Sequence, residues 1–168
     1  MDSHAIVVEI PRLRRYARAL LGNRAAADDL VQDTLERAWS RIDQWRPGSD
    51  LRAWLFGIMH NLRVDQLRRP LPPTRPVEEG DCDLPTRPTQ TDGLELKDLE
   101  SALNQLPDEQ REVVLLVALE DMGYADIAAM LGIPAGTVMS RLARGRERLR
   151  QIMAGLADTP ASRLRVVK

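Results

Sequence analysis

Residues 124–150 read YADIAAMLGIPAGTVMSRLARGRERLR, and they carry the clearest structural pattern in the chain. Ile127 and Leu131 fall on one face of a helix over 124–131. Gly132 follows at the point where a chain leaving a helix needs a positive φ, and Pro134 fixes φ for the first turn of a second helix. This order of helix, short turn and helix predicts a helix-turn-helix, whose second helix lies in the DNA major groove.

The second helix of this motif carries a basic outer face. Arg141, Arg144 and Arg148 share that face, while Thr137 and Ser140 lie near the N-terminal end, which reaches base edges. We therefore predict that these residues bind DNA. The alternative is a solvated basic helix that packs on another element. It would explain the arginines, but not the turn between the two helices. The motif does not distinguish a repressor, an activator and a polymerase subunit.

Charge is unevenly distributed along the 168 residues, although the net charge is only −1. Residues 77–126 are strongly acidic, whereas the residues from 134 onward are mostly basic. Segregation of this kind indicates separate surfaces for different partners. A net charge near zero by itself argues against a general nucleic-acid-binding protein, but it conceals this division.

The residue types argue against an enzyme and against a bound cofactor or metal. Cys82 is the single cysteine, so neither an intramolecular disulfide nor a cysteine zinc site can form. The carboxylates of Asp28, Asp29 and Asp33 lack a histidine partner on another helix, and His60 lacks a neighbouring nucleophile or base. No apolar run approaches the roughly 18 residues of a membrane span and no signal peptide is recognisable, so we expect a cytoplasmic protein.

The chain is expected to be all-α, beginning with a compact helical bundle over residues 1–69. Apolar periodicity predicts three helices in this bundle, over residues 11–21, 25–42 and 50–69. Pro11 is expected to open the first helix, with the residues before it frayed. Trp39 falls on the expected buried stripe of the second helix. Ser49 precedes the third helix, where serine is a preferred N-cap.

Residues 70–93 interrupt the helical pattern. They hold six of the chain's eleven prolines and show no apolar periodicity, which predicts a flexible, acidic tether. The expected units are therefore a first domain over 1–69, this linker, a second four-helix domain over 94–153 and a basic tail over 154–168. Two helices precede the helix-turn-helix, over 94–105 and 107–119. Leu96, Leu99 and Leu103 are expected to face the core of the second domain.

The third helix of the first domain mixes flat side chains, an amide and cations. Stacking surfaces combined with cations suit single-stranded nucleic acid, so this helix is a candidate for contact with separated DNA strands. Trp54 and Phe56 could instead pack in the core beside a solvated basic end, and the pattern alone favours that interpretation. The candidate residues are Trp54, His60, Asn61, Arg63 and Arg68.

Four blocks of sequence occur in the order that is typical of one protein family. The chain resembles the extracytoplasmic-function (ECF) sigma factors, which are specificity subunits of bacterial RNA polymerase. The blocks cover most of the chain, and four in order are far more specific than one helix-turn-helix. The matching blocks are DDLVQDTLERAW (28–39), WRPGSDLRAWLFGIMHNLRVDQLRR (45–69), LPDEQREVVLL (106–116) and MGYADIAAMLGIPAGTVMSRLARGRERLR (122–150).

The resemblance implies roles for the first domain. Its second helix would dock on the clamp helices of the polymerase β′ subunit through Asp29, Gln32, Asp33 and Glu36. Its third helix and the loop before it would open the promoter −10 element and hold a flipped base, with Asn61 beside the base pocket.

The resemblance also implies a role for the second domain, which would meet the polymerase β flap and read the promoter −35 element. That element would lie about two helical turns, roughly 70 Å, from the −10 element. Ser140, Arg141 and Arg144 match family positions at the DNA surface. Met139 departs from the pattern, because Lys or Arg is usual there, and this departure bears on one DNA contact.

The partners implied by the resemblance are core RNA polymerase, promoter DNA and a controlling anti-sigma factor. The chain would be monomeric when free, or in a 1:1 complex with the anti-sigma factor. Two other functions stay open at this level. A conventional dimeric helix-turn-helix regulator would bind a palindrome without polymerase. A sigma-like decoy would sequester an anti-sigma factor without touching DNA, and such a decoy has no need of the arginine stripe.

Overall fold

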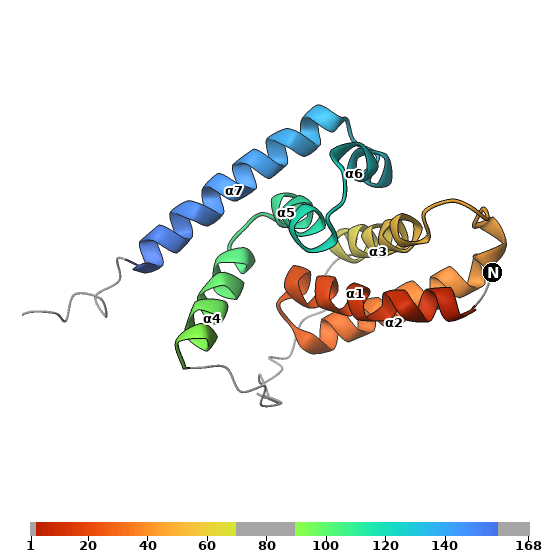
Figure 1. The fold of residues 1–168 in the computed structure, drawn as a ribbon, viewed down its shortest axis with the longest axis horizontal. Helices are drawn as coiled ribbons and strands as arrows, with labels where there is room; N and C mark the ends of the chain where they lie inside the picture. The colour runs from red at the N-terminus through yellow and green to blue at the C-terminus, as the bar shows by residue number, and fades with distance from the viewer. Residues whose placement is uncertain (1–2, 70–89, 158–168) are drawn as a thin grey trace, which may run out of the picture.

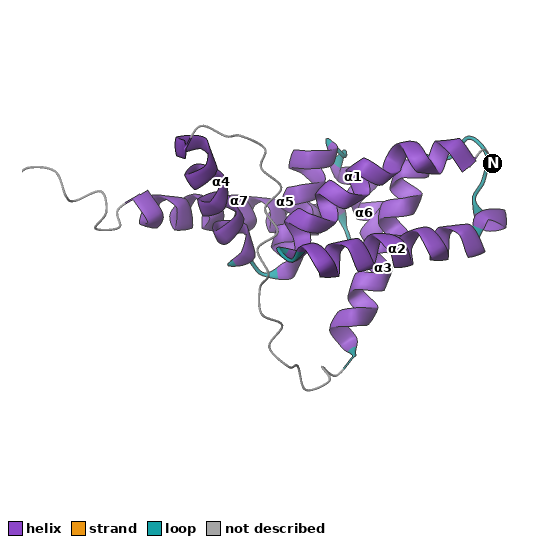
Figure 2. Cartoon of the chain, turned by 90° about the horizontal axis from the view of Figure 1, so that it is seen from below, coloured by secondary structure: helices purple, strands orange, loops and turns teal. Residues whose placement is uncertain are grey.

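The computed structural model describes residues 3–69 and 90–157, and within them every regular element is helical (Figure 2). The all-α prediction is therefore confirmed. The N-terminal half contains α1 (Ser3–Leu21), α2 (Arg24–Ser40), the 3-10 turn η1 (Ile42–Gln44) and α3 (Leu51–Arg68). The C-terminal half contains α4 (Gln90–Asn104), α5 (Asp108–Glu120), α6 (Tyr124–Leu131) and α7 (Ala135–Ala157).

The first helix begins earlier than the sequence pattern predicts. α1 starts at Ser3 and carries Pro11 in its interior, so the prediction that Pro11 opens the helix is wrong. An interior proline costs roughly 3 kcal/mol, because it removes one helical hydrogen bond and crowds the preceding turn. Ile6, which is only 6% exposed, offsets much of this cost by burying its side chain on the core.

The third helix is capped by Asp50 rather than by the predicted Ser49. The Asp50 carboxylate accepts a hydrogen bond from the Ala53 N–H at 3.2 Å. The Ser49 hydroxyl instead donates to the carbonyl oxygen of Arg46 at 2.7 Å, which closes the preceding turn. Both residue types cap helices well, and the geometry of the turn decides between them.

Trp39 is exposed, contrary to the prediction that it lies on the buried stripe of α2. Its exposed fraction is 58%, while Ala38 beside it is fully buried. Successive residues on a helix are turned by about 100°, so the side chain that follows Ala38 points away from the core. α2 then ends at Ser40, before the predicted Ile42.

The leucines of α4 form a second departure from the predicted core. Leu96 and Leu99 are 57% and 37% exposed, and only the end of the helix, at Ala102 and Leu103, is buried. α4 crosses α1 and α7 near its C-terminal end and extends away from the body at its other end (Figure 1). Helical periodicity correctly identifies the apolar face of α4, but Leu96 and Leu99 line an open cavity beside α1 instead of packing into the core.

The helix-turn-helix matches the prediction. α6 spans Tyr124–Leu131, and Gly132 ends it with φ 67°, donating its N–H to the Ala128 carbonyl. Ile127 and Val138 are fully buried where α6 meets α7. The positive φ confirms why glycine is required there, since an L-residue adopts this conformation only at a cost.

The two halves share one continuous apolar core. α5 lies near the centre of the molecule, with α7 on one side and the helices of the N-terminal half on the other (Figure 1). Leu13 and Met59 from the N-terminal half and Val113, Leu116 and Ile127 from the C-terminal half belong to this single cluster. The sequence patterns contain no indication that the halves pack together, because each helix shows only which of its own faces is apolar.

Candidate functional site

The outer face of α7 presents the predicted DNA-binding residues unequally. Arg144 and Arg148 are exposed, whereas Arg141 is half-buried and forms an ion pair with Glu109 of α5 at 3.3 Å. Thr137 and Ser140 are also half-buried, and the Ser140 hydroxyl donates to the Thr137 carbonyl at 3.1 Å. Two cations of the predicted stripe are therefore accessible to a large anionic partner as the structure stands.

The predicted residues on α3 divide in the same way. Asn61 and Arg68 are exposed, while Trp54, His60 and Arg63 are half-buried. Trp54 packs against the edge of the apolar core, as the core-packing alternative expected.

Phe56 belongs to the core rather than to any binding surface. It is 2% exposed and meets Tyr16 in an edge-to-face contact with ring centroids 5.0 Å apart. Edge-to-face pairs of this kind add about 1 kcal/mol beyond the burial of the rings. Phe56 therefore fixes α3 on α1 and leaves the polar residues of α3 to face outward or toward α5.

Three carboxylates near the start of α5 meet basic side chains from both candidate DNA surfaces. The His60 Nδ1 lies 2.6 Å from a carboxylate oxygen of Glu112, and Arg63 lies 3.6 Å from Asp108. Together with the contact between Arg141 and Glu109, these pairs line a cavity of about 370 Å³ between the two halves. The structure thus brings residues from both predicted DNA sites to one place, which the sequence did not suggest.

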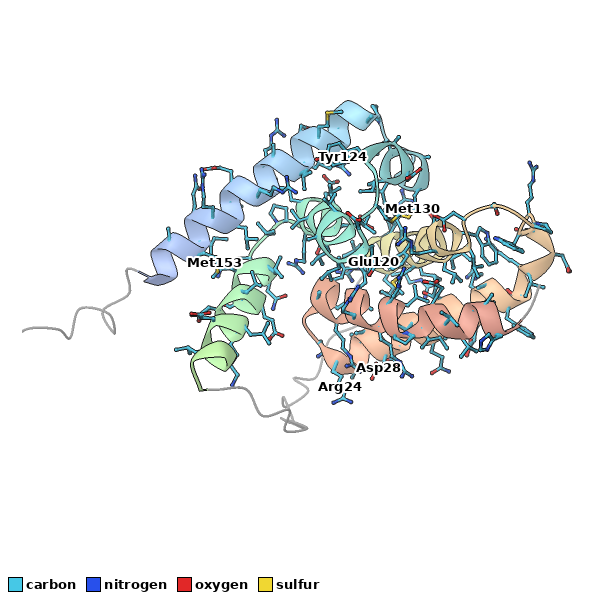
Figure 3. The ribbon with its side chains drawn as sticks, in the orientation of Figure 1. Arg24, Asp28, Glu120, Tyr124, Met130 and Met153 are labelled. Carbon is cyan, nitrogen blue, oxygen red and sulfur yellow. The ribbon has the colours of Figure 1, made fainter. Side chains whose placement is uncertain are left out.

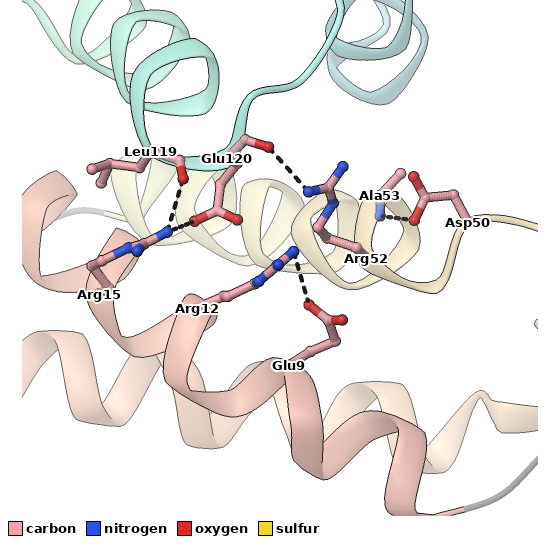
Figure 4. A network of polar contacts seen from close by, with 8 residues as sticks. All are labelled: Glu9, Arg12, Arg15, Asp50, Arg52, Ala53, Leu119 and Glu120. Atoms are coloured by element: carbon pink, nitrogen blue, oxygen red, sulfur yellow. Dashed lines mark hydrogen bonds and ion pairs between the residues drawn. The ribbon is translucent and has the colours of Figure 1, made fainter.

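A second polar cluster connects the halves at the other end of α5 (Figure 4). Arg15 of α1 donates to the Leu119 carbonyl at 2.8 Å and to the Glu120 carboxylate at 3.2 Å. Arg52 of α3 donates to the Glu120 carbonyl at 3.0 Å. Figure 3 shows Glu120 and Met130 along the boundary where α1 and α3 meet α5 and α6, which we call the seam. A Cβ placed on Gly57 of α3 would contact Met130 of α6 there.

Arg111 is a buried cation that holds three segments together. Its guanidinium donates to the carbonyls of Leu103, Asn104 and Leu106 around the end of α4, and to the carbonyl of Leu20 at the end of α1. Burial lowers the pKa of Arg111, and the nearby carboxylate of Asp108 opposes that shift. Helix C-termini carry unpaired carbonyls and partial negative charge, so a cation is well placed there.

Tyr16 lies at the same seam with its hydroxyl surrounded by protein. Burial raises the pKa of Tyr16 well above its ordinary value, and the carboxylates of Glu112 and Glu120 raise it further. The neutral form of this side chain is therefore strongly favoured in the folded protein.

The outer face of α2 is exposed, as a docking surface requires. Asp29, Gln32, Asp33 and Glu36 all face solvent, and the Gln32 amide donates to Glu36 at 3.0 Å. Asp33 and Glu36 also border a cavity of about 410 Å³ between α2 and α3. The exposed Trp39 lies three residues after Glu36 on the same face, so this surface combines carboxylates with a large aromatic ring.

Neither a metal site nor a membrane span is found within residues 3–69 and 90–157. In these ranges no cluster of three or more His, Cys, Asp or Glu side chains is placed to hold a metal ion. No helix in the same ranges is both long and apolar enough to cross a lipid bilayer. Cys82 lies outside the described residues.

Comparison with known proteins identifies the family. The model of the Sigma2 domain of PhyR matches residues 6–60, and the model of Sigma-70 region 4 matches residues 96–149. The ECF RNA polymerase sigma factor EcfG of Rhodopseudomonas palustris is 42% identical over 153 residues, which is 88% of this chain and 82% of the relative. The chain belongs to the ECF family of RNA polymerase sigma factors. In this ECF sigma factor, α1 to α3 therefore correspond to the Sigma2 match, and α4 to α7 to region 4.

Two solved complexes are similar to this sigma factor, and the first of them pairs a sigma factor with an anti-sigma factor. One is RpoE of Bartonella quintana in complex with NepR, with a TM-score of 0.70, 32% identity, and coverage of 90% of this chain and 95% of that one. The other is CnrH in complex with the cytosolic domain of CnrY, with a TM-score of 0.67, 29% identity, and coverage of 93% and 88%. The fold of both halves thus has counterparts in two solved structures.

Proposed function

We propose that this ECF sigma factor binds core RNA polymerase and directs promoter-specific initiation by recognising the −35 and −10 elements and helping to melt the −10 region. The observation that carries the proposal is the helix-turn-helix of a region 4 match, with Arg144 and Arg148 exposed on its second helix. Catalysis would belong to the polymerase, and the chain would supply recognition.

The −35 element would be read by α7. In helix-turn-helix proteins the N-terminal part of the second helix reaches base edges, and this part carries Thr137, Ser140 and Arg141. Arg144 and Arg148 follow on the same face, where cations neutralise phosphates. The half-buried state of Arg141 in this structure means that Glu109 must release it before it can meet DNA.

The −10 element would be opened and held by α3 and the loop before it. Extruding a base costs a few kcal/mol of unstacking, so polar and stacking contacts must offset that cost. Asn61 and Arg68 are exposed and available for such contacts, whereas Trp54, His60 and Arg63 are half-buried. The family resemblance and the exposure of Asn61 support its place beside the flipped base.

Core polymerase would dock on the exposed face of α2. Asp29, Asp33 and Glu36 provide charge, and Trp39 provides the kind of large aromatic contact that is enriched in protein interfaces. An anti-sigma factor would control the chain, as the complex of the sigma factor RpoE with the anti-sigma factor NepR suggests by analogy. The free chain would be monomeric.

Run-off transcription with purified core RNA polymerase on a promoter library tests this proposal. We expect specific transcripts only when both core enzyme and this chain are present, and weak or no promoter binding by the chain alone. Tight binding of a palindromic duplex by a dimer, without core enzyme, would instead identify a conventional regulator. Binding of an anti-sigma factor without any transcription would identify a decoy.

Charge reversal tests the docking face directly. Asp33→Arg should abolish most of the binding to immobilised core polymerase, because it places a cation at the centre of an acidic surface, while the thermal melt should stay unchanged. Glu95→Arg, which makes the same change on the exposed face of α4, is the matched control and should bind normally. Equal recovery of core enzyme with both variants would count against the α2 face.

A further inference from the structure

The contacts at the start of α5 join residues that the proposed function assigns to two different DNA elements. Glu112 and Asp108 pair with His60 and Arg63, which belong to the −10 candidates. Glu109 pairs with Arg141, which belongs to the −35 candidates. One short acidic segment of α5 therefore neutralises cations from both surfaces simultaneously.

The three basic side chains in these pairs are largely enclosed. The side chains of His60, Arg63 and Arg141 are 17%, 22% and 23% exposed. By contrast, Arg144 and Arg148 on the same face of α7 remain exposed. Phosphates can approach the exposed pair, whereas the three paired side chains are largely enclosed.

We propose that α5 is an internal substitute for DNA phosphates. Asp108 and Glu112 hold the two halves of the free chain together through Arg63 and His60, and Glu109 occupies Arg141 within the C-terminal half. This inference depends on the proposed function for the identity of the two DNA surfaces. Promoter elements roughly 70 Å apart cannot be reached by halves that share one core, so opening must precede initiation. Of the three pairs, those of Asp108 and Glu112 cross between the halves and resist opening.

The geometry of the pairs indicates that the closed state is reversible. Arg63 lies 3.6 Å from Asp108, beyond ordinary hydrogen-bond distance, and its buried Nε has no hydrogen-bond partner among the described residues. Glu109 is 72% exposed, so water and salt screen its attraction to Arg141. Only the contact between His60 and Glu112 is both short and largely enclosed. Binding to polymerase or DNA can therefore compete with these contacts.

Removal of the three carboxylates tests the proposal in the full-length chain. The variant combines Asp108→Asn, Glu109→Gln and Glu112→Gln. Its matched control makes the same chemical changes on neighbouring α4, as Glu95→Gln, Asp98→Asn and Glu100→Gln. Both variants gain the same net charge, so a difference between them reports the position of the carboxylates.

The first measurement is the distance between spin labels on the two halves. Labels are attached at Ala25→Cys and Ala154→Cys, which are exposed positions on α2 and α7, after replacement of the single cysteine by Cys82→Ser. We expect a longer and broader distance distribution in the carboxylate variant, and the parent distribution in the control. An unchanged distribution in a carboxylate variant that retains the helical content of the parent overturns the proposal.

The second measurement is the affinity for a short fluorescent duplex, read by anisotropy. We expect the carboxylate variant to bind the duplex about tenfold more tightly than the control. A gain of this size is expected when the fraction of chains that can bind DNA rises from about a tenth to nearly all. If the spin-label distances lengthen but the affinity for the duplex does not rise, α5 does hold the halves closed. The assignment of the DNA-binding surfaces is then wrong. The two measurements thus separate failure of this inference from failure of the proposed function.

A disulfide across the seam keeps the test decisive if the carboxylate variant does not fold. In Gly57→Cys/Met130→Cys, the new sulfur on α6 would lie near the present Met130 Cγ, 3.5 Å from a Cβ on residue 57. With Cys82→Ser in the background, the oxidised protein should fail to support transcription, and a reductant should restore it. Full activity of the oxidised, cross-linked protein overturns the need for opening.

Discussion

Replacement of Arg111 by methionine should destabilise the whole protein, because one guanidinium satisfies four backbone carbonyls. The four N···O distances lie between 2.7 and 2.9 Å, and the residue is 8% exposed. Hydrogen bonds to a charged donor contribute about 1.5–3 kcal/mol each, but contributions that share one side chain do not add fully. Methionine fills the space of the stem and supplies no donor.

The expected loss in the free energy of unfolding is about 3–5 kcal/mol, similar to breaking a buried ion pair. That is a large share of the roughly 5–15 kcal/mol that stabilises an ordinary domain. Arg111→Lys should lie between the parent and Arg111→Met, since an ammonium keeps the charge but cannot reach all four carbonyls.

Urea unfolding followed by circular dichroism measures these differences. Arg150→Met is the control, because Arg150 is exposed and pairs with Glu147 on the same helix, so its loss should stay within about 0.5 kcal/mol. If the free energy of unfolding of Arg111→Met lies within about 1 kcal/mol of that of the control, the four carbonyls do not depend on this side chain. Arg111 then does not hold the three segments together.

Three further predictions concern pH, salt and docking. Because the pKa of Tyr16 is raised by folding, the unfolded chain loses this proton first, so stability should fall as pH rises above about 10. Tyr16→Phe keeps the ring contact with Phe56 and should weaken that alkaline loss, measured by urea unfolding between about pH 9 and about pH 11. Arg144→Ala should reduce the salt dependence of binding to a −35 duplex by a slope of about 1, measured by anisotropy across a salt series, and an unchanged slope would show that this cation does not meet a phosphate. Trp39→Ala should weaken binding to core polymerase by about tenfold without lowering the melting temperature, since truncation of a central interface residue costs about 1–2 kcal/mol. Normal affinity in that variant would remove Trp39 from the docking face.

The fold class and the helix-turn-helix were predictable because their signals are local. Ile127, Gly132 and Pro134 lie within one or two helical turns of each other. The first helix, the positive φ that ends it and the start of the second helix therefore follow from the types of neighbouring residues. The exposure of Arg144 and Arg148 follows in the same way, from helical spacing on a face without apolar residues. Such features need no knowledge of distant segments.

The errors arose where a distant segment decides the outcome. Pro11 lies inside α1 because the first turns of that helix have a core to pack on, and Leu96 is exposed because α4 meets its neighbours only near its end. Trp39 continues the apolar stripe of α2 in the sequence, but the helical rotation that buries Ala38 turns Trp39 outward. Local propensity cannot show which apolar face finds a partner.

The sequence by itself determined the helices, their order, the helix-turn-helix motif and the family, because each depends on residue types at short, regular spacing. The tertiary structure alone decided that His60 meets Glu112 across 52 positions, and that Arg111 reaches back to Leu20. Contacts of this kind form when two separately predictable helices pack in one particular orientation. No periodicity within either helix specifies that orientation, and it is this packing that places the carboxylates of α5 over the cations of both candidate DNA surfaces.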